Sequence, residues 1–374
     1  MRAIGVKHQR PDPITPLYSD DDYKSLHFYA GSDNTCPVQL TSPRRAELIW
    51  FAGLLPVCCR FVADRQECSM TRRTSIAVIG MGGIGGVVAS CLELSGRHRI
   101  VVCARRSAGA VSIEQPEGTH CLTLDVVADY EQADHVDWIL LCTKAQDTAS
   151  ASAWFERLCG PGTCVAVLQN GIEHEQRVAP YTGNRPVVPA VVYFNGKRRS
   201  ISDFSFRHGS EVDIAIPDIA AGRAFAELFD GTSLKVSPRE DFQQRLWTKF
   251  LLNAVANPIT ALTRQRLAVF GRDDILSVAS KIIQEGLAVA RASGVDPGEK
   301  AESQVLERLL AYHPDEATSM YIDNVNGRVM EVSALTGAIV VMGERLGVPT
   351  PTNRVLLALL QAISDASRDA CATG

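Results

Sequence analysis

One lysine and two asparagines stand four residues apart within the apolar segment 246–258. In a helix, Lys249, Asn253 and Asn257 would share one face, with a drift of only about 40° per step. Such polar groups on a buried helix need partners, water or a ligand to satisfy them. An ammonium facing a ligand can stabilise negative charge that develops on an oxygen and then donate a proton. The alternative is a solvent-facing stripe on an amphipathic helix.

A glycine-rich run lies between an apolar strand pattern and an apolar helix pattern. Its residues are Gly80, Met81, Gly82, Gly83, Ile84 and Gly85. Gly80 would allow a tight turn, Gly82 a close approach of the backbone to a pyrophosphate, and Gly85 close packing of helix on strand. The phosphate would lie at the N-terminus of the helix. We therefore expect a dinucleotide site; an ordinary glycine-rich turn is the alternative.

The end of the next strand, residues 99–103, indicates which nicotinamide cofactor binds. NAD enzymes usually carry an acidic residue there, whereas this chain has Arg105. A guanidinium suits the 2′-phosphate of NADPH through charge-assisted hydrogen bonds. We therefore predict NADPH/NADP as the cofactor, although a solvated surface arginine would give the same pattern.

Polar residues also follow two later strands, at 136–142 and 163–168. Lys144 comes after the first and Asn170 after the second. Open α/β sheets bind ligands at the carboxyl ends of their strands, so both residues are candidates to contact cofactor or substrate. Locally, a solvated lysine and a simple Asn-Gly turn explain them equally well.

The elements predict an α/β protein in which a Rossmann-type doubly wound sheet, residues 71–239, precedes an all-helical domain, residues 240–374. The sheet domain should include a helix at about 146–158. Residues 202–208 and 211–216 look like a hairpin around 208–210 that would extend the sheet with antiparallel edges. Candidate helices of the second domain lie near 240–257, 274–293, 299–312, 329–346 and 351–367.

Composition excludes several classes of protein. The chain has 374 residues, 46% hydrophobic and 21% charged, and a net charge of −4, which gives no basic footprint for nucleic acid. Its 11 cysteines and 8 histidines show no metal-binding spacing, so we expect no metal site and a cytoplasmic protein. Residues 1–70 look like a poorly ordered extension. The apolar stretch 48–62 within them is too short to span a bilayer, so we expect no membrane attachment.

The chain resembles the ketopantoate reductase (2-dehydropantoate 2-reductase) family over roughly residues 74–360. Besides the glycine run and Arg105, the matching motifs are Thr143-Lys144-Ala145, Gln169-Asn170-Gly171, Trp247-x-Lys249-x-x-x-Asn253-x-x-x-Asn257-Pro258 and Ser319-Met320-x-x-Asp323-x-x-x-Gly327-Arg328-x-x-Glu331. The resemblance implies NADPH-dependent reduction of ketopantoate to pantoate, in pantothenate biosynthesis.

The resemblance also implies roles by position. Lys249 would be the general acid and Glu331, expected in the first turn of a helix, would lie beside the reacting ketone. Glu331 should also oppose the loss of basicity that burial imposes on the lysine, and orient its ammonium. Asn170, with Asn253, Asn257 and Ser319, would hold the substrate. Lys144 would sit near the nicotinamide and Arg105 on the adenosine phosphate.

The chain departs from the family pattern beside Glu331, where Met330, Ser333 and Thr336 replace the usual Thr, Asp and Asn. A changed pocket wall would favour an NADPH-dependent paralogue acting on another 2-oxo acid or ketone. A non-catalytic NADP(H)-binding sensor is a further alternative, which the retained lysine and glutamate disfavour. A homodimer is possible in this family.

Overall fold

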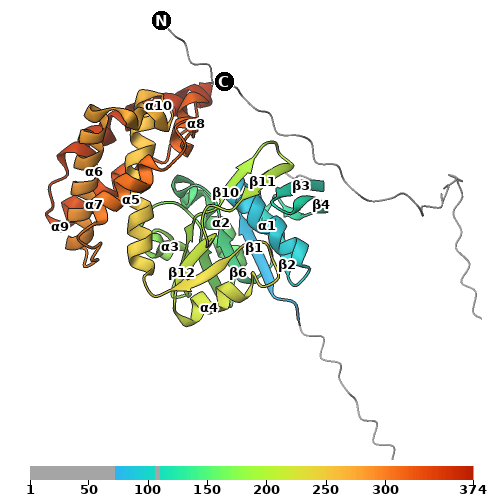
Figure 1. Ribbon diagram of the computed structural model, residues 1–374. Helices are drawn as coiled ribbons and strands as arrows, with labels where there is room; N and C mark the ends of the chain where they lie inside the picture. The colour runs from blue at the N-terminus through green and yellow to red at the C-terminus, as the bar shows by residue number, and fades with distance from the viewer. Residues whose placement is uncertain (1–71, 106–109, 374) are drawn as a thin grey trace, which may run out of the picture. The chain divides into compact units, whose positions relative to one another are not determined.

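Six parallel strands form the central sheet of the computed structural model, which describes residues 72–105 and 110–373. The sheet order is β5-β2-β1-β6-β7-β8, the doubly wound 3-2-1-4-5-6 arrangement of dinucleotide-binding domains. Its strands are β1 (Ser75–Ile79), β2 (Arg99–Cys103), β5 (Asp125–Val127), β6 (Val136–Leu141), β7 (Cys159–Val167) and β8 (Val187–Pro189). The predicted fold class is therefore confirmed (Figure 1).

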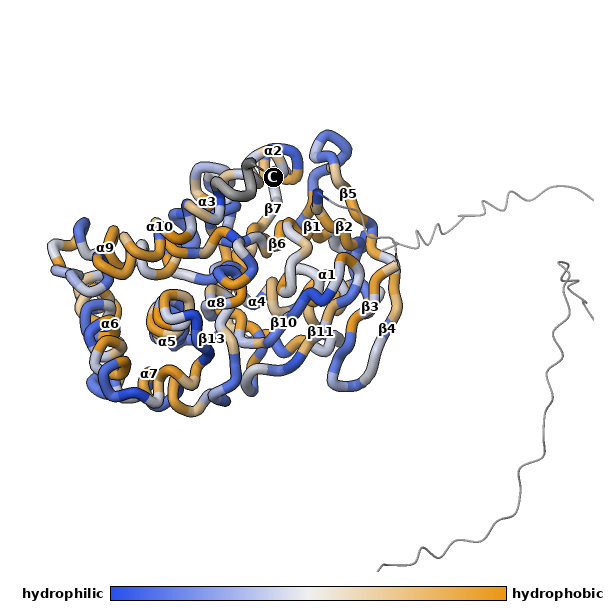
Figure 2. Tube along the Cα trace, turned by 90° about the horizontal axis from the view of Figure 1, so that it is seen from above, coloured by the Kyte–Doolittle hydropathy of each residue, from blue (hydrophilic) through white to orange (hydrophobic). Residues whose placement is uncertain are grey.

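Both faces of this sheet are buried. In β1, Ile76 and Val78 belong to one apolar cluster, and Ala77 and Ile79 to another, as alternation along a strand requires. Figure 2 shows hydrophobic residues along β1, β2 and β6. Helix α1 (Gly83–Ser95) packs into the first cluster, and α2 (Ser152–Leu158) and α3 (His174–Thr182) into the second. Burial on both faces explains why the strands are continuous apolar runs.

Two smaller sheets accompany the central one. The first has the order β10-β11-β3-β4 and the second β13-β12-β9. Their strands, and one further helix, are β3 (Ala110–Gln115), β4 (Gly118–Thr123), β9 (Val191–Val192), β10 (Asn195–Arg198), β11 (Asp203–Arg207), β12 (Ile214–Pro217), β13 (Val236–Arg239) and α4 (Ala220–Glu227). The β3–β4 hairpin lies in the connection between β2 and β5. The prediction that such strands extend the central sheet with antiparallel edges is wrong, because all six of its strands are parallel.

The predicted hairpin around residues 208–210 is also wrong. Strand β11 pairs antiparallel with β10 and parallel with β3, whereas β12 belongs to the other small sheet. The fully buried Asp213 explains the separation. Its carboxylate accepts hydrogen bonds from His208 Nδ1 (2.9 Å) and from the backbone N–H of Lys235 (2.9 Å). The second bond holds the segment before β12 against Lys235, the residue that precedes β13. Turn residues alone did not reveal this buried acceptor.

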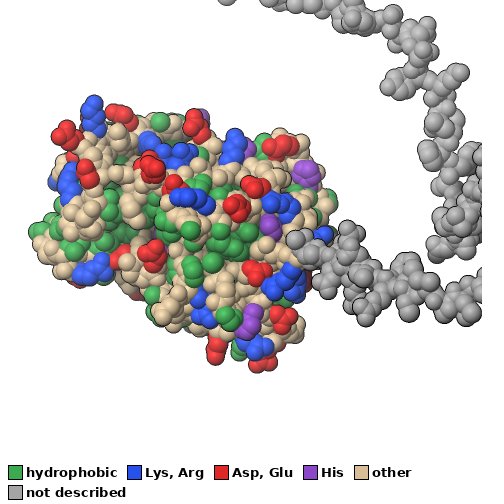
Figure 3. Space-filling model, turned by 90° about the horizontal axis from the view of Figure 1, so that it is seen from below, with side chains coloured by type: hydrophobic (Ala, Val, Ile, Leu, Met, Phe, Trp, Pro, Cys, Tyr) green, Lys and Arg blue, Asp and Glu red, His purple; other side chains and the backbone are tan. Residues whose placement is uncertain are grey.

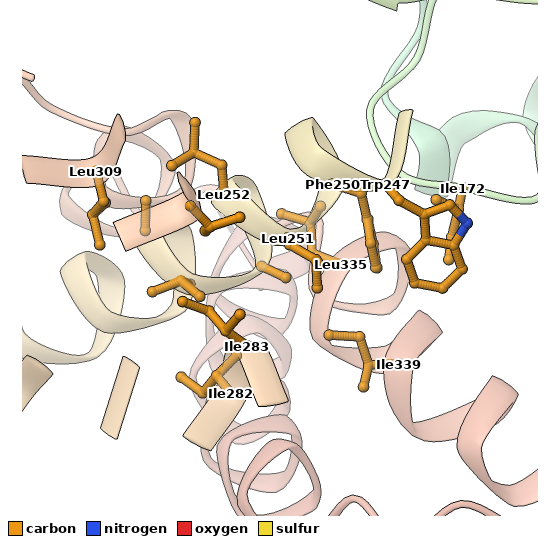
Figure 4. Packing of buried hydrophobic residues seen from close by; sticks show 14 of the residues in the cluster. Ile172, Trp247, Phe250, Leu251, Leu252, Ile282, Ile283, Leu309, Leu335 and Ile339 are labelled. Carbon is orange, nitrogen blue, oxygen red and sulfur yellow. The ribbon is translucent and has the colours of Figure 1, made fainter. Parts of the chain in front are cut away.

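The helical part of the chain begins with α5 (Phe242–Thr263), whose apolar residues form the centre of a second core. Figure 4 shows Trp247, Phe250 and Leu251 of α5 near Leu335, with Ile172 of the sheet domain beside Trp247. The remaining elements are η4 (Leu267–Gly271), α6 (Asp273–Ala292), α7 (Ala301–Leu310), α8 (Ser319–Val325), η5 (Ser333–Gly337), α9 (Ala338–Leu346) and α10 (Pro351–Thr373). These elements confirm the predicted helical domain.

Three predicted helices differ from the structure. Helix α5 continues through Pro258, because the buried residues after it keep packing and a proline removes only one helical hydrogen bond. The helix predicted from 329 begins at Ser333, as a π-turn. The helix predicted at 146–158 starts with two 3₁₀ turns, η2 (Ala145–Asp147) and η3 (Ala149–Ala151). Helix α8 was not predicted, although its N-cap Thr318 accepts from the N–H of Tyr321.

The surface carries charges of both signs. On the face in Figure 3, Lys and Arg are interspersed with Asp and Glu among hydrophobic and polar side chains. Across residues 72–105 and 110–373, no helix combines the length and apolarity needed to cross a membrane. The predicted extension, residues 1–70, lies outside the described residues.

Candidate active site

A cleft of about 1380 Å³ runs along the carboxyl ends of β1 and β6 and reaches α5. The sheet domain lines it with residues 80–84 of the glycine run, Arg105, Lys144 and Asn170, whereas Gly85 is buried. The helical domain contributes Lys249, Asn253, Ser319 and Glu331. Strand order reverses between β1 and β6, so the cleft lies where doubly wound sheets bind their ligands. Segments far apart in the sequence therefore meet at one site.

The glycine run forms a backbone cradle. Gly80 has φ +99°, and a Cβ there would approach Thr143 at 2.9 Å. A Cβ on Gly85 would lie 1.9 Å from the carbonyl oxygen of Gly80, so only glycine allows this packing of α1 on β1. Gly82, by contrast, faces open space and begins α1 without any side-chain cap or acid in the first turn. The N-terminal amides of α1 thus suit a phosphate.

Arg105 stands two residues after the end of β2 and lines the same cleft. Its side chain is exposed and pairs with no carboxylate among the residues whose positions are described. The guanidinium therefore remains available to a ligand phosphate. Its position fits the predicted contact with the adenosine phosphate, which stays a prediction.

Lys249 projects from α5 into the cleft, half-buried, and its Nζ lies 5.4 Å from the ring centroid of Tyr193. Burial lowers the pKa of its ammonium to about 8. We expected Glu331 to oppose this lowering of the Lys249 pKa. That effect is not seen: burial is the cause of the lowered pKa, and within the described ranges no ion pair joins the two residues. An aromatic face instead stabilises the cation.

Glu331 is nearly buried and joins the two domains. Its Oε1 accepts a hydrogen bond from the backbone N–H of Ala145 (3.0 Å), and its Oε2 accepts one from Asn170 Nδ2 (3.5 Å). Its predicted place in the first turn of a helix is wrong, since it precedes the π-turn that starts at Ser333. The carboxylate thus connects the loop after β6, which carries Lys144, with the loop after β7, which carries Asn170.

The polar stripe on α5 divides into two parts. Lys249 and Asn253 line the cleft, whereas Asn257, one turn later, is buried. Asn257 Oδ1 accepts from Ser319 Oγ (3.1 Å) and from the backbone N–H of Met320 (3.0 Å). The contacts of Asn257 therefore hold the start of α8, and through it Ser319, which does line the cleft.

Lys144 is tied across the cleft to Asp323 of α8. Its Nζ forms a charged hydrogen bond with Oδ2 of this buried aspartate. Burial of a carboxylate is tolerated when it is paired in this way. The pair joins the loop after β6 to the helical domain, close to where Glu331 makes its own contacts.

Three supporting residues were not assigned roles from the sequence: Tyr193, Asp323 and Arg177. Arg177 donates to Gln169 Oε1 (3.0 Å), to the carbonyl of Asn170 (3.3 Å) and to that of Ile172 (2.8 Å), which fixes the loop carrying Asn170. Asp323 stood in a matched motif, so its position carried a signal. Tyr193 and Arg177 carried none, because their contacts depend on how distant segments meet.

The three positions that depart from the family pattern do not line the cleft. Met330 and Thr336 are buried, and Ser333 is exposed away from the cleft-lining residues. The expectation that they alter the pocket wall is therefore wrong. Met330 packs in the core of the helical domain, and Ser333 and Thr336 lie within η5 itself.

Two family models match this chain, one over the sheet domain and one over the helical domain. The model of the family described as "Ketopantoate reductase PanE/ApbA" matches residues 76–221, and that of its C-terminal part matches residues 241–364. The chain belongs to the ketopantoate reductase family. A 2-dehydropantoate 2-reductase of Caulobacter vibrioides is 36% identical over 292 residues, 77% of this chain and 99% of the relative. One of Mycobacterium tuberculosis is 33% identical over 300 residues, 78% and 98%.

Solved structures of the family share the fold. A PanE/ApbA family ketopantoate reductase from Ralstonia eutropha JMP134 has a TM-score of 0.72 and 27% identity, covering 79% of this chain and 100% of its own. A ketopantoate reductase of Staphylococcus aureus, described as dimeric, has a TM-score of 0.69 at 24% identity, covering 78% and 99%. A D-mandelate dehydrogenase has the same fold at 20% identity, with a TM-score of 0.69 and coverage of 79% and 99%.

Proposed function

We propose that this protein reduces 2-dehydropantoate (ketopantoate) to pantoate with NADPH, as a step of pantothenate biosynthesis. The observation that carries the proposal is a lysine of lowered pKa in the cleft that the glycine run opens. Relatives named for this reaction align with this chain over 98–99% of their own length, which supports the proposal.

The cleft fits a phosphorylated dinucleotide. Gly82 leaves open space beside the uncapped start of α1, and Arg105, which forms no ion pair with any described residue, offers its guanidinium just after β2. When bound there, NADPH supplies the hydride that the reduction needs. The chain's own residues bind its phosphates, and Lys144 and Asn170, at the ends of β6 and β7, line the nicotinamide end. We propose NADPH rather than NADH because no carboxylate follows β2.

Lys249 acts as the proton donor. Reduction of a ketone leaves negative charge on its oxygen, which the ammonium stabilises and then neutralises by transferring a proton from Nζ. A pKa of about 8 keeps the group protonated at neutral pH while making it a better acid than an exposed lysine. We propose that Asn253, Asn170 and Ser319 bind the polar groups of the substrate through neutral hydrogen bonds.

Glu331 positions this machinery and lies beside the ketone. Its carboxylate holds the Asn170 amide and the backbone of Ala145, so loop and helix keep one geometry around the substrate. Asn257 contributes indirectly, because it holds Ser319 at the start of α8. We therefore propose that Asn257 positions Ser319 and does not itself contact the substrate, which is the role predicted for it from the sequence.

The alternatives are an NADPH-dependent reductase of another 2-oxo acid or ketone and a non-catalytic NADP(H)-binding sensor. The fold is shared with a D-mandelate dehydrogenase, so fold alone does not fix the 2-oxo acid or ketone that is reduced. A non-catalytic NADP(H) sensor would not need a proton donor in the cleft, which disfavours it. We further propose a cytoplasmic protein, since Cys103 and Cys142 are free, buried thiols, as is usual in a reducing compartment. We also propose a homodimer, by analogy with the dimeric relative.

Substrate specificity is tested by following NADPH oxidation at ~340 nm with ketopantoate and a panel of other 2-oxo acids, then with NADH. We expect the highest kcat/KM with ketopantoate and NADPH. Turnover only with another carbonyl compound would support the paralogue, and binding without any turnover would support the sensor. Equal use of NADH would contradict the role given to Arg105.

A further inference from the structure

We propose that Arg198 is a cofactor-binding residue that clamps the pyrophosphate of the dinucleotide against the glycine run. The inference rests on the proposed NADPH dependence and goes beyond it by naming a residue from a different segment, strand β10. Arg198 lies more than 110 residues after the glycine run and was given no role from the sequence, where it is part of the run Lys197-Arg198-Arg199.

Strand β10 lies directly against the start of α1. A Cβ added to Gly83 would lie 2.2 Å from the carbonyl oxygen of Gly196, and a Cβ added to Gly196 would lie 2.7 Å from that of Gly83. Backbone therefore touches backbone at this crossing. Because Gly196 is only two residues before Arg198, the position of the arginine is fixed relative to the phosphate cradle.

The guanidinium is held in place by two hydrogen bonds. Nη1 donates to the carbonyl oxygen of Met81, inside the glycine run (2.9 Å), and Nε donates to that of Ser200 (3.0 Å). Neither bond uses Nη2, which has no acceptor among the described residues. A guanidinium fixed in this way loses little entropy when it binds an anion.

Among the described residues, the charge of Arg198 has no carboxylate partner, unlike the charges of Arg207 and Lys144, which also line the cleft. Arg207 pairs with Glu114 and Lys144 with Asp323. Arg198 lines the cleft and forms no ion pair in the part of the chain that the structure describes. A cation without a carboxylate, beside the uncapped amides of α1, suits a doubly charged pyrophosphate.

The contact with Met81 favours the pyrophosphate over the 2′-phosphate. The 2′-phosphate is expected at the end of β2, where Arg105 stands. Met81 instead belongs to the turn whose backbone approaches the pyrophosphate. Arg198 and Arg105 should therefore recognise two different groups of one cofactor, and this division of labour can be measured.

The test compares Arg198→Gln with a matched control, Arg199→Gln. Arg199 is the next residue, pairs with Glu114 and does not line the cleft. Dissociation constants of NADPH, NADH and adenosine 2′-monophosphate are measured by calorimetry or competition. We expect Arg198→Gln to weaken NADPH and NADH equally, by about 10- to 100-fold. Binding of adenosine 2′-monophosphate should be unchanged, as should all binding by Arg199→Gln.

Each other outcome has a defined meaning. Unchanged affinity for both cofactors, or a loss for NADPH alone, would overturn the assignment to the pyrophosphate. If the wild-type protein binds neither cofactor, the proposed function itself is overturned, and the clamp with it. If the wild type binds both cofactors and Arg198→Gln binds them equally well, only the clamp is overturned. If Arg198→Gln loses its fold by circular dichroism, Arg198→Lys decides. Equal weakening of both cofactors, by about 3- to 10-fold, supports the clamp, and unchanged affinity overturns it.

Discussion

The two ends of the cleft are built in different ways. The phosphate end consists mostly of backbone, in one short run where Gly80, Gly82 and Gly85 leave room that any side chain would fill or strain. The lysine end consists of side chains from both domains, including Lys249 and Glu331. The first end depends on what is missing, a Cβ, whereas the second depends on how distant helices and loops meet.

This difference determines how each end responds to change. At the phosphate end, substitutions act through steric fit, so neighbouring glycines can differ sharply in their effect. At the lysine end, substitutions act through charge and hydrogen bonds, so chemistry and stability can be separated residue by residue.

Replacing Lys249 by alanine removes the proton donor. We expect kcat to fall by about 10²- to 10⁴-fold, the usual contribution of a general acid, while the dissociation constant of NADPH stays nearly the same. Single-turnover kinetics and cofactor titration measure the two quantities. Lys281→Ala on the exposed face of α6 is the matched control and should change neither. An unchanged kcat in Lys249→Ala would show that another group donates the proton.

Two glycines in the same run should behave in opposite ways when changed to alanine. Gly85→Ala places a Cβ 1.9 Å from the backbone of Gly80, so we expect a loss of about 3 kcal/mol in the free energy of unfolding. Gly82→Ala meets no atom within 4 Å and has φ −82°, so its stability should stay within about 0.5 kcal/mol. Its NADPH affinity should still fall, because the methyl group occupies space for the phosphates.

Denaturant unfolding and cofactor titration of both variants check this contrast. Equal loss of stability in Gly82→Ala and Gly85→Ala would mean that the run is uniformly packed. Unchanged NADPH affinity in Gly82→Ala would mean that the phosphate does not approach the backbone there.

The same contrast explains what the sequence could predict. The phosphate end is local, because strand, turn and helix follow one another and the glycine spacing reports the steric need. The fold class, a doubly wound sheet followed by helices, was likewise predictable from periodicity. The small sheets were not, because β11 pairs with β10 and β3 while the buried Asp213 draws the following segment elsewhere.

The lysine end was only partly predictable. Helical spacing correctly placed Lys249 and Asn253 together in the cleft, but it could not show that Asn257 turns inward to Ser319. The bond from Ala145 to Glu331 spans 186 residues, and no local pattern encodes such a contact. Residue types indicated the chemistry, while the tertiary fold decided which residues face the ligand.

Asn253 and Asn257 provide the next test, since they are one helical turn apart. Asn257→Ala would leave Ser319 Oγ and the N–H of Met320 without their acceptor, so we expect a loss of about 2 kcal/mol in the free energy of unfolding. Asn253→Ala should keep stability within about 0.5 kcal/mol and instead raise KM for the oxo acid or lower kcat. Chemical denaturation and steady-state kinetics measure both. A large loss of stability in Asn253→Ala would remove it from the substrate site.

The pH dependence of kcat/KM is the finest test of the lysine end. Burial lowers the pKa of Lys249 to about 8, and only the protonated form can donate. For ketone reduction, kcat/KM should be constant below this pH and fall about tenfold per pH unit above it, since kcat/KM reports the free enzyme. For oxidation of the alcohol the neutral amine accepts the proton, so the rate should rise towards the same pKa and then level off. A bound carboxylate would raise the pKa, shifting the profile of kcat to higher pH. If kcat/KM of Lys249→Ala still falls above about pH 8, another group must cause the fall, and the assignment of this pKa to Lys249 would be wrong.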